Sequence, residues 1–204
     1  MPNDFGIKHR VAREAATLLY SGAEKEYKQA KEKAAVIFGV HFLPSNLEVA
    51  LELDKIAEEN EGSKRKEILI QMRREAMVVM HLLARFYPIL IGSVWRGTIK
   101  QGSDIDIAVY TNQPEEIISV LKAGGLKVLK TAWTTVNKQG ATLESFHIYA
   151  ETAAKHGLEI VARSREESGK KRQCEIFGDE LKGLHIKELE KVLENHPTQR
   201  FIPS

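Results

Sequence analysis

The sequence predicts an α+β fold in which a helical N-terminal module precedes a mixed β-sheet with flanking helices. Apolar residues recur at helical spacing through four segments between residues 8 and 86. Short apolar runs of strand length, separated by glycine-containing turns, begin at residue 89. The length of 204 residues allows one ordinary domain and a smaller module, each with a core of its own.

The composition is that of a globular protein, with 43% hydrophobic and 28% charged residues and a formal net charge of +2. This near balance gives no bulk electrostatic indication of nucleic-acid binding. The first residues lack a basic region followed by an apolar one, and no apolar run approaches the length of a membrane span. We therefore expect a cytoplasmic protein with no membrane partner.

Four amphipathic helices are predicted before any strand. The first covers residues 8–21 and ends at a Ser-Gly pair, and the second covers 23–38 and ends at Gly39. The third begins at Ser45, which stands at capping-box spacing from Glu48. A break around Gly62 separates it from a long fourth helix over about 64–86, whose apolar stripe includes two methionines.

The domain boundary is expected near this break, with a helical module over 1–62 and a second domain over 63–204. The fourth helix extends to about residue 87 and leads directly into the first strand. Because one helix belongs to both parts, the boundary is soft.

The second domain is expected to contain a sheet with two further helices. Asn112 is predicted to cap a helix with Pro114 in its first turn, and another helix covers 186–195. The last three strands follow one another along the chain and should form a meander that extends the sheet. The five predicted strands are Ile89–Ile91, Asp104–Val109, Leu126–Val136, Ala141–Thr152 and Leu158–Ala162.

Two carboxylates stand where an apolar strand would not be expected to carry any. Side chains alternate across a strand, so Asp104 and Asp106 share one face with Cα atoms about 6–7 Å apart, while Ile105 and Ile107 point to the core. Unpaired carboxylates this close repel each other, and a divalent cation relieves that repulsion most directly. Hard oxygen ligands of this kind suit magnesium or manganese.

A second feature of the same stretch suits phosphate. Gly92-Ser93 lets the backbone turn sharply after the first strand and offers amide groups and a hydroxyl to phosphate oxygens. Arg96 adds a cation for a phosphate or a structural role. A P-loop and a G-x-G-x-x-G fingerprint are both missing from the sequence. A phosphate-binding turn beside a metal-binding carboxylate pair favours phosphoryl or nucleotidyl transfer.

Taken together, Gly92-Ser93, Arg96-Gly97-Thr98 and Ser103-Asp104-Ile105-Asp106 resemble the signature of the DNA polymerase beta type nucleotidyltransferase superfamily, including its small prokaryotic members. The resemblance implies a nucleotidyltransferase-type mixed sheet. It also implies metal-dependent transfer of a nucleoside monophosphate from a nucleoside triphosphate, such as ATP, to an acceptor hydroxyl with release of pyrophosphate.

The family places a third carboxylate on a later strand in an apolar-acid-apolar setting, and Glu159 matches that position. Glu144 and Glu151 are competitors, although Glu144 shares strand parity with Phe146 and so points toward the core face. His147 has the opposite parity and would face the site, where it is either a substrate contact or a packing residue.

By this resemblance, Asp104, Asp106 and Glu159 are the expected catalytic residues and the ligands of two Mg²⁺ ions, with Mn²⁺ possible. The acceptor stays open between RNA, a small molecule and a protein, and the base preference and oligomeric state are also open. The alternative is an antitoxin-like partner-binding protein, non-catalytic or weakly catalytic, that retains a nucleotide site. The expected nucleotide-binding residues are Gly92, Ser93, Arg96, Thr98 and Ser103.

Overall fold

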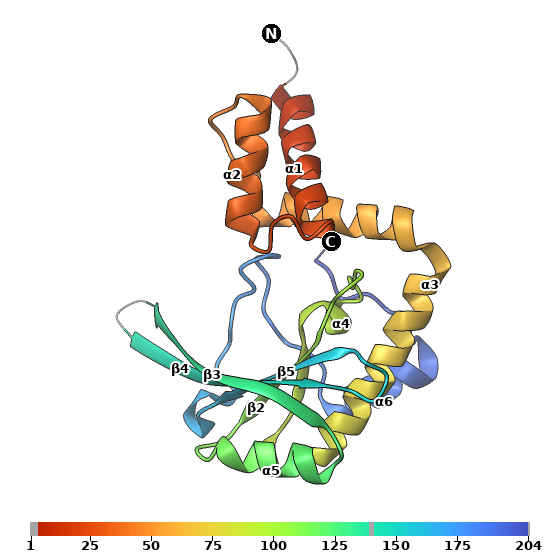
Figure 1. Ribbon diagram of the computed structural model, residues 1–204, viewed down its shortest axis with the longest axis vertical. Helices are drawn as coiled ribbons and strands as arrows, with labels where there is room; N and C mark the ends of the chain where they lie inside the picture. Colours follow the sequence, from red (N-terminus) through yellow and green to blue (C-terminus); the bar gives the residue numbers. More distant parts are fainter. Residues whose placement is uncertain (1–3, 139–140, 204) are drawn as a thin grey trace. The chain divides into compact units, whose positions relative to one another are not determined.

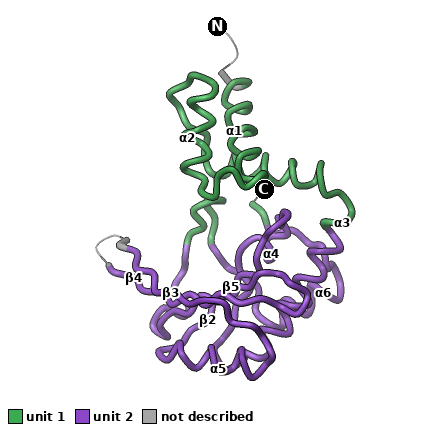
Figure 2. Tube along the Cα trace, viewed as in Figure 1, with its two compact units in different colours: residues 1–65, 173–180, 202–204 green, residues 66–172, 181–201 purple. Residues whose placement is uncertain are grey.

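Helices come first along the chain and a five-stranded sheet follows, which confirms the predicted α+β class. The computed structural model (Figure 1) describes residues 4–138 and 141–203. The chain divides into two compact units, shown in Figure 2. Unit 1 comprises 1–65, 173–180 and 202–204, and unit 2 comprises 66–172 and 181–201.

Unit 1 is built from α1 (Asp4–Tyr20), α2 (Tyr27–Phe38) and the first part of α3 (Asn46–Leu82). The apolar stripes of these helices meet in a core of small and branched residues, among them Val11, Ala15, Ala30, Ala34, Val49 and Ile56. The predicted capping box is present. The Ser45 amide donates to Glu48 Oε2 at 2.7 Å, and the Glu48 amide donates to Ser45 Oγ at 3.1 Å.

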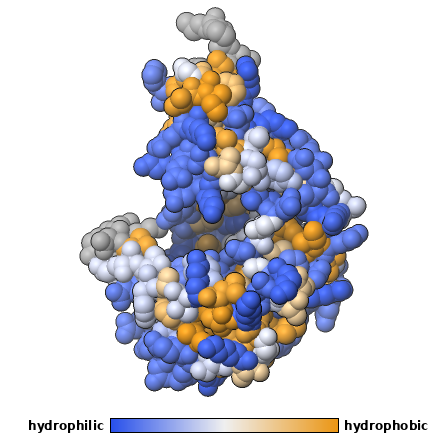
Figure 3. Space-filling view, viewed as in Figure 1, coloured by the Kyte–Doolittle hydropathy of each residue, from blue (hydrophilic) through white to orange (hydrophobic). Residues whose placement is uncertain are grey.

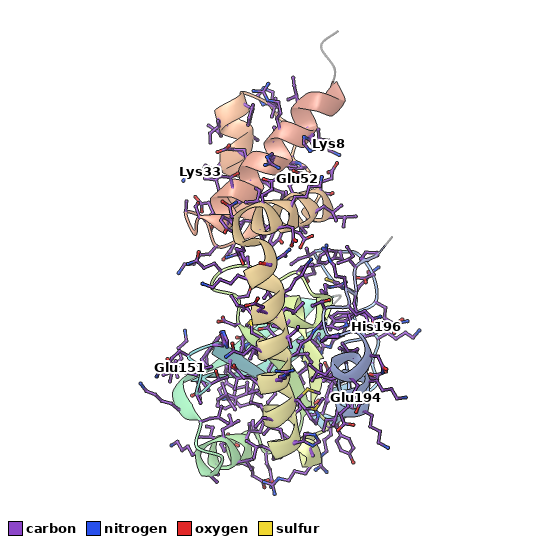
Figure 4. The ribbon with its side chains drawn as sticks, turned by 90° about the vertical axis from the view of Figure 1, so that its right-hand side faces the viewer. Lys8, Lys33, Glu52, Glu151, Glu194 and His196 are labelled. Atoms are coloured by element: carbon purple, nitrogen blue, oxygen red, sulfur yellow. The ribbon has the colours of Figure 1, made fainter. Side chains whose placement is uncertain are left out.

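Charged groups also connect the helices of unit 1. Glu52 is only 3% exposed and is labelled in Figure 4. It accepts from Lys55 at 2.6 Å and from Arg13 at 3.3 Å, and lies 3.1 Å from His9 Nε2. The two cationic partners, Lys55 and Arg13, therefore offset the cost of burying this carboxylate.

Helix α3 is a pair of helical segments joined at Gly62, where φ is 53° and ψ is −134°. A positive φ with this ψ is open to glycine and costly for other residues, so the two predicted helices are separated at this residue. The second segment ends at Leu82, and a 3₁₀ turn, η1 (Ala84–Phe86), leads to the first strand.

The sheet of unit 2 has the order β1-β2-β5-β4-β3. The neighbouring strands β2 and β5 are parallel, and the other neighbouring pairs are antiparallel. The predicted meander of the last three strands is present as β3-β4-β5. The strands are β1 (Ile89–Ile91), β2 (Ile105–Tyr110), β3 (Lys127–Lys138), β4 (Ala141–Glu151) and β5 (Gly157–Arg163).

One face of the sheet packs against the core, because alternate residues of each central strand point to the same side. These buried residues are Ile105, Ile107 and Val109 of β2, Phe146, Ile148 and Ala150 of β4, and Leu158, Ile160 and Ala162 of β5. They pack with apolar residues of α3, α5 (Glu115–Ala123) and α6 (Ile186–Asn195). The intervening residues, which include Asp106, His147 and Glu159, lie on the opposite face.

Two short segments differ from expectation. Gly92 has the positive φ of the predicted sharp turn, but the five-residue helix α4 (Gly92–Arg96) that begins there was not predicted. Asn112 does not cap α5, because its Oδ1 accepts the Arg165 amide at 3.0 Å, and Thr111 Oγ1 accepts the Gln113 amide.

Buried Arg73 ties α4 to the C-terminal segment within unit 2. Its guanidinium donates to the carbonyls of Val94 and Trp95 in α4 at 3.1 and 2.8 Å. It also donates to the carbonyls of Pro197 and Gln199 at 2.7 and 2.8 Å. A side chain with no exposed surface thus satisfies four backbone acceptors, and the burial lowers its pKa to about 10.

Most of the surface visible in Figure 3 is hydrophilic, with separate hydrophobic patches. Large exposed apolar residues occur in both units, including Val36 at 80% and Trp133 at 60% exposure. None of the helices within 4–138 and 141–203 is both long enough and apolar enough to cross a membrane.

Candidate active site

The first part of the candidate site lies at the junction of β1 and α4. Gly92 has a φ of +70°, and a Cβ built on it would lie 2.0 Å from Asp106 Oδ2. Ile91, immediately before it, is in register with Asp106 across the β1–β2 pair. The carboxylate of Asp106 therefore rests directly against the Gly92 backbone, in space that any side chain at residue 92 would take.

A second glycine provides the corresponding space for Asp104. This aspartate precedes β2 by one residue, so the expectation that the strand itself contains both aspartates was wrong by one position. A Cβ on Gly157 would lie 2.0 Å from Asp104 Oδ1. The importance of Gly157 was missed in the sequence, where it follows Lys155-His156 as an ordinary turn glycine.

Strand register brings the third carboxylate beside this pair. Asp106 of β2 and Glu159 of β5 are direct partners in the parallel pairing. The neighbours of each carboxylate along its strand are apolar and point into the core. The two carboxylates therefore lie on the same, opposite face of the sheet. The structure thus gathers Asp104, Asp106 and Glu159, which are separated by up to 55 residues in the sequence.

The surroundings of the site disfavour the ionised form of its two aspartates. Burial raises the pKa of Asp106 to about 7, and the charges of Glu159 and Asp104 add to the increase. The pKa of Asp104 is also raised, by partial burial of its carboxyl and then by Glu159, while Lys100 acts in the opposite direction. Such carboxylates favour a cation between them.

Glu159 has two neighbours from β4. His147 Nδ1 lies 2.6 Å from Glu159 Oε1, and His147 Nε2 lies 2.9 Å from Ser145 Oγ. Tyr149 is the cross-strand partner of Glu159, and burial together with Glu159 raises the pKa of the Tyr149 hydroxyl. The strand parity of His147 had indicated that it faces the site, but not that it contacts Glu159.

The competing glutamates lie elsewhere. Glu144 is exposed and pairs in register with Thr135 of β3, on the parity of buried Phe146. Glu151, labelled in Figure 4, forms an ion pair with Lys155 at 2.5 Å. Neither is among the charges that shift the pKa values of Asp104 and Asp106.

The predicted nucleotide-binding residues lie in and after α4 and in the turn before Asp104. Ser93 is half-buried next to Gly92, and its carbonyl accepts the Thr98 amide at 3.0 Å. Ser103 Oγ accepts the Lys100 amide at 2.9 Å, which shapes the turn before Asp104.

Arg96 is 3% exposed and lies over the Trp95 ring, with Nη1 donating to the Phe201 carbonyl at 2.9 Å. Of the two roles considered for Arg96, phosphate binding and a structural role, this contact fits the structural one. Its phosphate contact, like those of Thr98 and Ser103, stays a prediction.

The donor set at Asp104, Asp106 and Glu159 suits a hard divalent cation, because all three side chains offer carboxylate oxygens. Within the described ranges no three His, Cys, Asp or Glu side chains are already arranged as a metal-binding group. The hydrogen bond between Glu159 and His147 engages one of the carboxylate oxygens that such a group would use.

Comparison with protein families gives a match to the nucleotidyltransferase domain over residues 88–201, more than half of the chain. The chain belongs to the nucleotidyltransferase domain family. The matched region begins just before β1 and includes every residue of the candidate site. A comparison with curated proteins finds no significant match.

Two solved structures show a more distant similarity to this nucleotidyltransferase domain. One is described as a cytoplasmic RNA terminal U-transferase, with 17% identity and a TM-score of 0.33 over 57% of this chain and 36% of that chain. The other is a GLD-2/RNP-8 complex, with 12% identity and a TM-score of 0.33 over 60% of this chain and 38% of that chain. This chain therefore spans little more than a third of either solved chain.

Proposed function

We propose that this chain is a metal-dependent nucleotidyltransferase that transfers a nucleoside monophosphate from a nucleoside triphosphate to an acceptor hydroxyl. The observation that carries the proposal is the register of Asp106 with Glu159 across two parallel strands, with Asp104 one residue before the strand. Membership of the nucleotidyltransferase domain family supports the same reaction class.

Asp104, Asp106 and Glu159 would hold two Mg²⁺ ions, or Mn²⁺ in their place. When bound, the ions would lower the pKa of the acceptor hydroxyl and neutralise charge on the triphosphate and the departing pyrophosphate. Asp106 fits this role because burial, and then the charges of Glu159 and Asp104, disfavour its ionised form and raise its pKa, and a bound cation would favour the ionised form.

The protein groups have separate tasks in the proposed reaction. Gly92 and Ser93 are proposed to bind the triphosphate beside Asp106. Glu159 is proposed to accept the proton of the acceptor hydroxyl as its oxygen forms a bond to the α-phosphorus. The bond from the α-phosphorus to the oxygen that bridges to the β-phosphate breaks, and pyrophosphate leaves. Positioning and charge stabilisation would supply most of the rate enhancement.

The test is incubation of the purified protein with Mg²⁺ and each α-labelled triphosphate, together with cell extract separated into RNA, protein and small-molecule fractions. We expect label to enter one fraction. Asp104→Asn and Glu159→Gln should reduce the transfer at least about 100-fold, because each removes a ligand that the transition state requires.

Glu144→Gln is the matched control, since it neutralises a sheet glutamate outside the site and should leave transfer unchanged. Undiminished transfer by Asp104→Asn would refute the site assignment. Absence of label from every fraction, with metal-dependent nucleotide binding intact, would favour the partner-binding alternative.

A further inference from the structure

We infer that His147 is a positioning residue that holds Glu159 in place for divalent metal binding, with Ser145 fixing His147 in turn. The inference rests on the proposed function, because it concerns the same metal site. It assigns a task to two β4 residues that touch neither nucleotide nor acceptor in the proposed reaction.

The hydrogen-bonding chain runs through both ring nitrogens of His147. A carboxylate accepts, so the 2.6 Å contact with Glu159 places a proton on His147 Nδ1. His147 Nε2 lies 2.9 Å from Ser145 Oγ, and a hydroxyl can either donate to a ring nitrogen or accept from it. Both ring nitrogens are therefore engaged, one by Glu159 and the other by Ser145.

The geometry of the sheet makes this chain rigid. Ser145 and His147 are alternate residues of β4, so both point to the site face. His147 pairs in register with Val161 and Glu159 with Tyr149, so His147 and Glu159 are diagonal neighbours on adjacent strands. The His147 and Glu159 side chains are only 18% and 23% exposed, which limits the water available to replace their contact.

Holding Glu159 matters because the carboxylates around it repel. Glu159 is the direct cross-strand partner of Asp106, and like charges this close repel, so a freely rotating Glu159 would turn away from it toward water. The hydrogen bond from His147 to Oε1 opposes that rotation. Hydrogen bonds to ligating carboxylates commonly contribute about 10–100-fold in metal affinity or activity.

The experiment compares three substitutions by titrating Mn²⁺ into the full chain without nucleotide and measuring its affinity calorimetrically. His147→Ala removes the donor and should weaken Mn²⁺ binding about 10-fold or more. His147→Asn places an amide donor near the position of Nδ1 and should restore most of the affinity. His147→Gln places its donor nearer the position of Nε2 and should behave like His147→Ala.

Two controls separate positioning from a general loss of structure. His81→Ala removes an exposed histidine of α3 and should bind Mn²⁺ as the wild type does. The thermal unfolding midpoint without metal should be alike in His147→Ala and His147→Asn, whereas their Mn²⁺ affinities differ. In the transfer assay, His147→Ala should lower kcat and recover part of it at higher Mg²⁺.

Unchanged Mn²⁺ binding by His147→Ala would overturn the inference. Tighter binding would overturn it too, because it would mean that His147 competes with the metal for Glu159. Equal affinities of the Ala and Asn variants would overturn it as well. If transfer depends on Asp104 but the His147 variants bind Mn²⁺ and transfer label as the wild type does, only the positioning role is refuted. Mn²⁺ binding that depends on His147, without transfer to any fraction, would refute the proposed function and leave the positioning role standing.

Discussion

Asp106 connects the stability of the fold with the charge of the site. Its pKa is about 7 in the folded chain, while an unfolded aspartate ionises near about 3.9. Between these values the folded chain holds a proton that the unfolded chain has lost. The contribution of Asp106 to the free energy of unfolding therefore falls as the pH rises from about 4 to about 7.

This gives a prediction for metal-free protein. From about pH 5 to about pH 8, the unfolding midpoint of the wild type should fall relative to that of Asp106→Asn, which carries no charge at any pH. Thermal unfolding of both proteins in chelator-treated buffers measures the difference. Comparing the two removes the opposing contributions of carboxylates with lowered pKa values, such as Glu48 and Glu52. Parallel curves for the two proteins would contradict the prediction.

For single residues, the sequence indicated which carboxylates belong to the site but not which groups they contact. Alternation of apolar and acidic residues was enough to put Asp106 and Glu159 on the site face. It could not give their register, because parallel pairing of β2 with β5 depends on chain segments about 50 residues apart. The space that Gly157 leaves for Asp104 follows from that pairing and has no local signal.

At the scale of elements, helix α4 depends on groups outside itself. Five residues are too few for an apolar period to be recognised or for a helix to be stable alone. Arg73 satisfies two carbonyls of α4 from a different helix. This explains why the longer helices and the strands were predicted from the sequence while α4 was expected to be a turn.

Replacement of Arg73 should therefore be strongly destabilising. Arg73→Met keeps much of the apolar side chain and removes the donors to four carbonyls, two in α4 and two in the C-terminal segment. Leaving several of these carbonyls unsatisfied should lower the free energy of unfolding by at least about 3 kcal/mol. Urea denaturation measures the change. Arg74→Met, at the next and exposed position of α3, is the control and should alter stability by less than about 0.5 kcal/mol.

At the scale of the whole molecule, the notable property is that the two hydrophobic cores have no residue in common within 4–138 and 141–203. The buried residues of the unit 1 core lie between Val11 and Ile56, and those of the unit 2 core lie between Leu69 and Val192. The sequence predicted two parts from its helical and strand-like periods. It gave no indication that residues 173–180 group with unit 1, because that depends on tertiary contacts such as the one between Asn46 and the Glu175 carbonyl.

Separate cores predict that a chain lacking residues 1–60 retains the fold of unit 2 and its Mn²⁺ binding. We expect this chain to lose transfer to its natural acceptor, on the hypothesis that the N-terminal helices select or position the acceptor. Circular dichroism, Mn²⁺ titration and the labelled-triphosphate assay report on the three properties. Unchanged transfer by the shortened chain would refute the role given to the helices, while loss of Mn²⁺ binding would refute the independence of unit 2.

The bonds of Arg73 also bear on the order of events during synthesis on the ribosome. The core residues of unit 1 are made first and can pack before the sheet exists. Arg73, in contrast, meets Pro197 and Gln199 across separations of 124 and 126 residues. Asp104, Asp106 and Glu159 are all translated before those carbonyls. A nascent chain should thus carry its full set of carboxylates while α4 still lacks its final support, and activity should appear only once the C-terminal segment has been made.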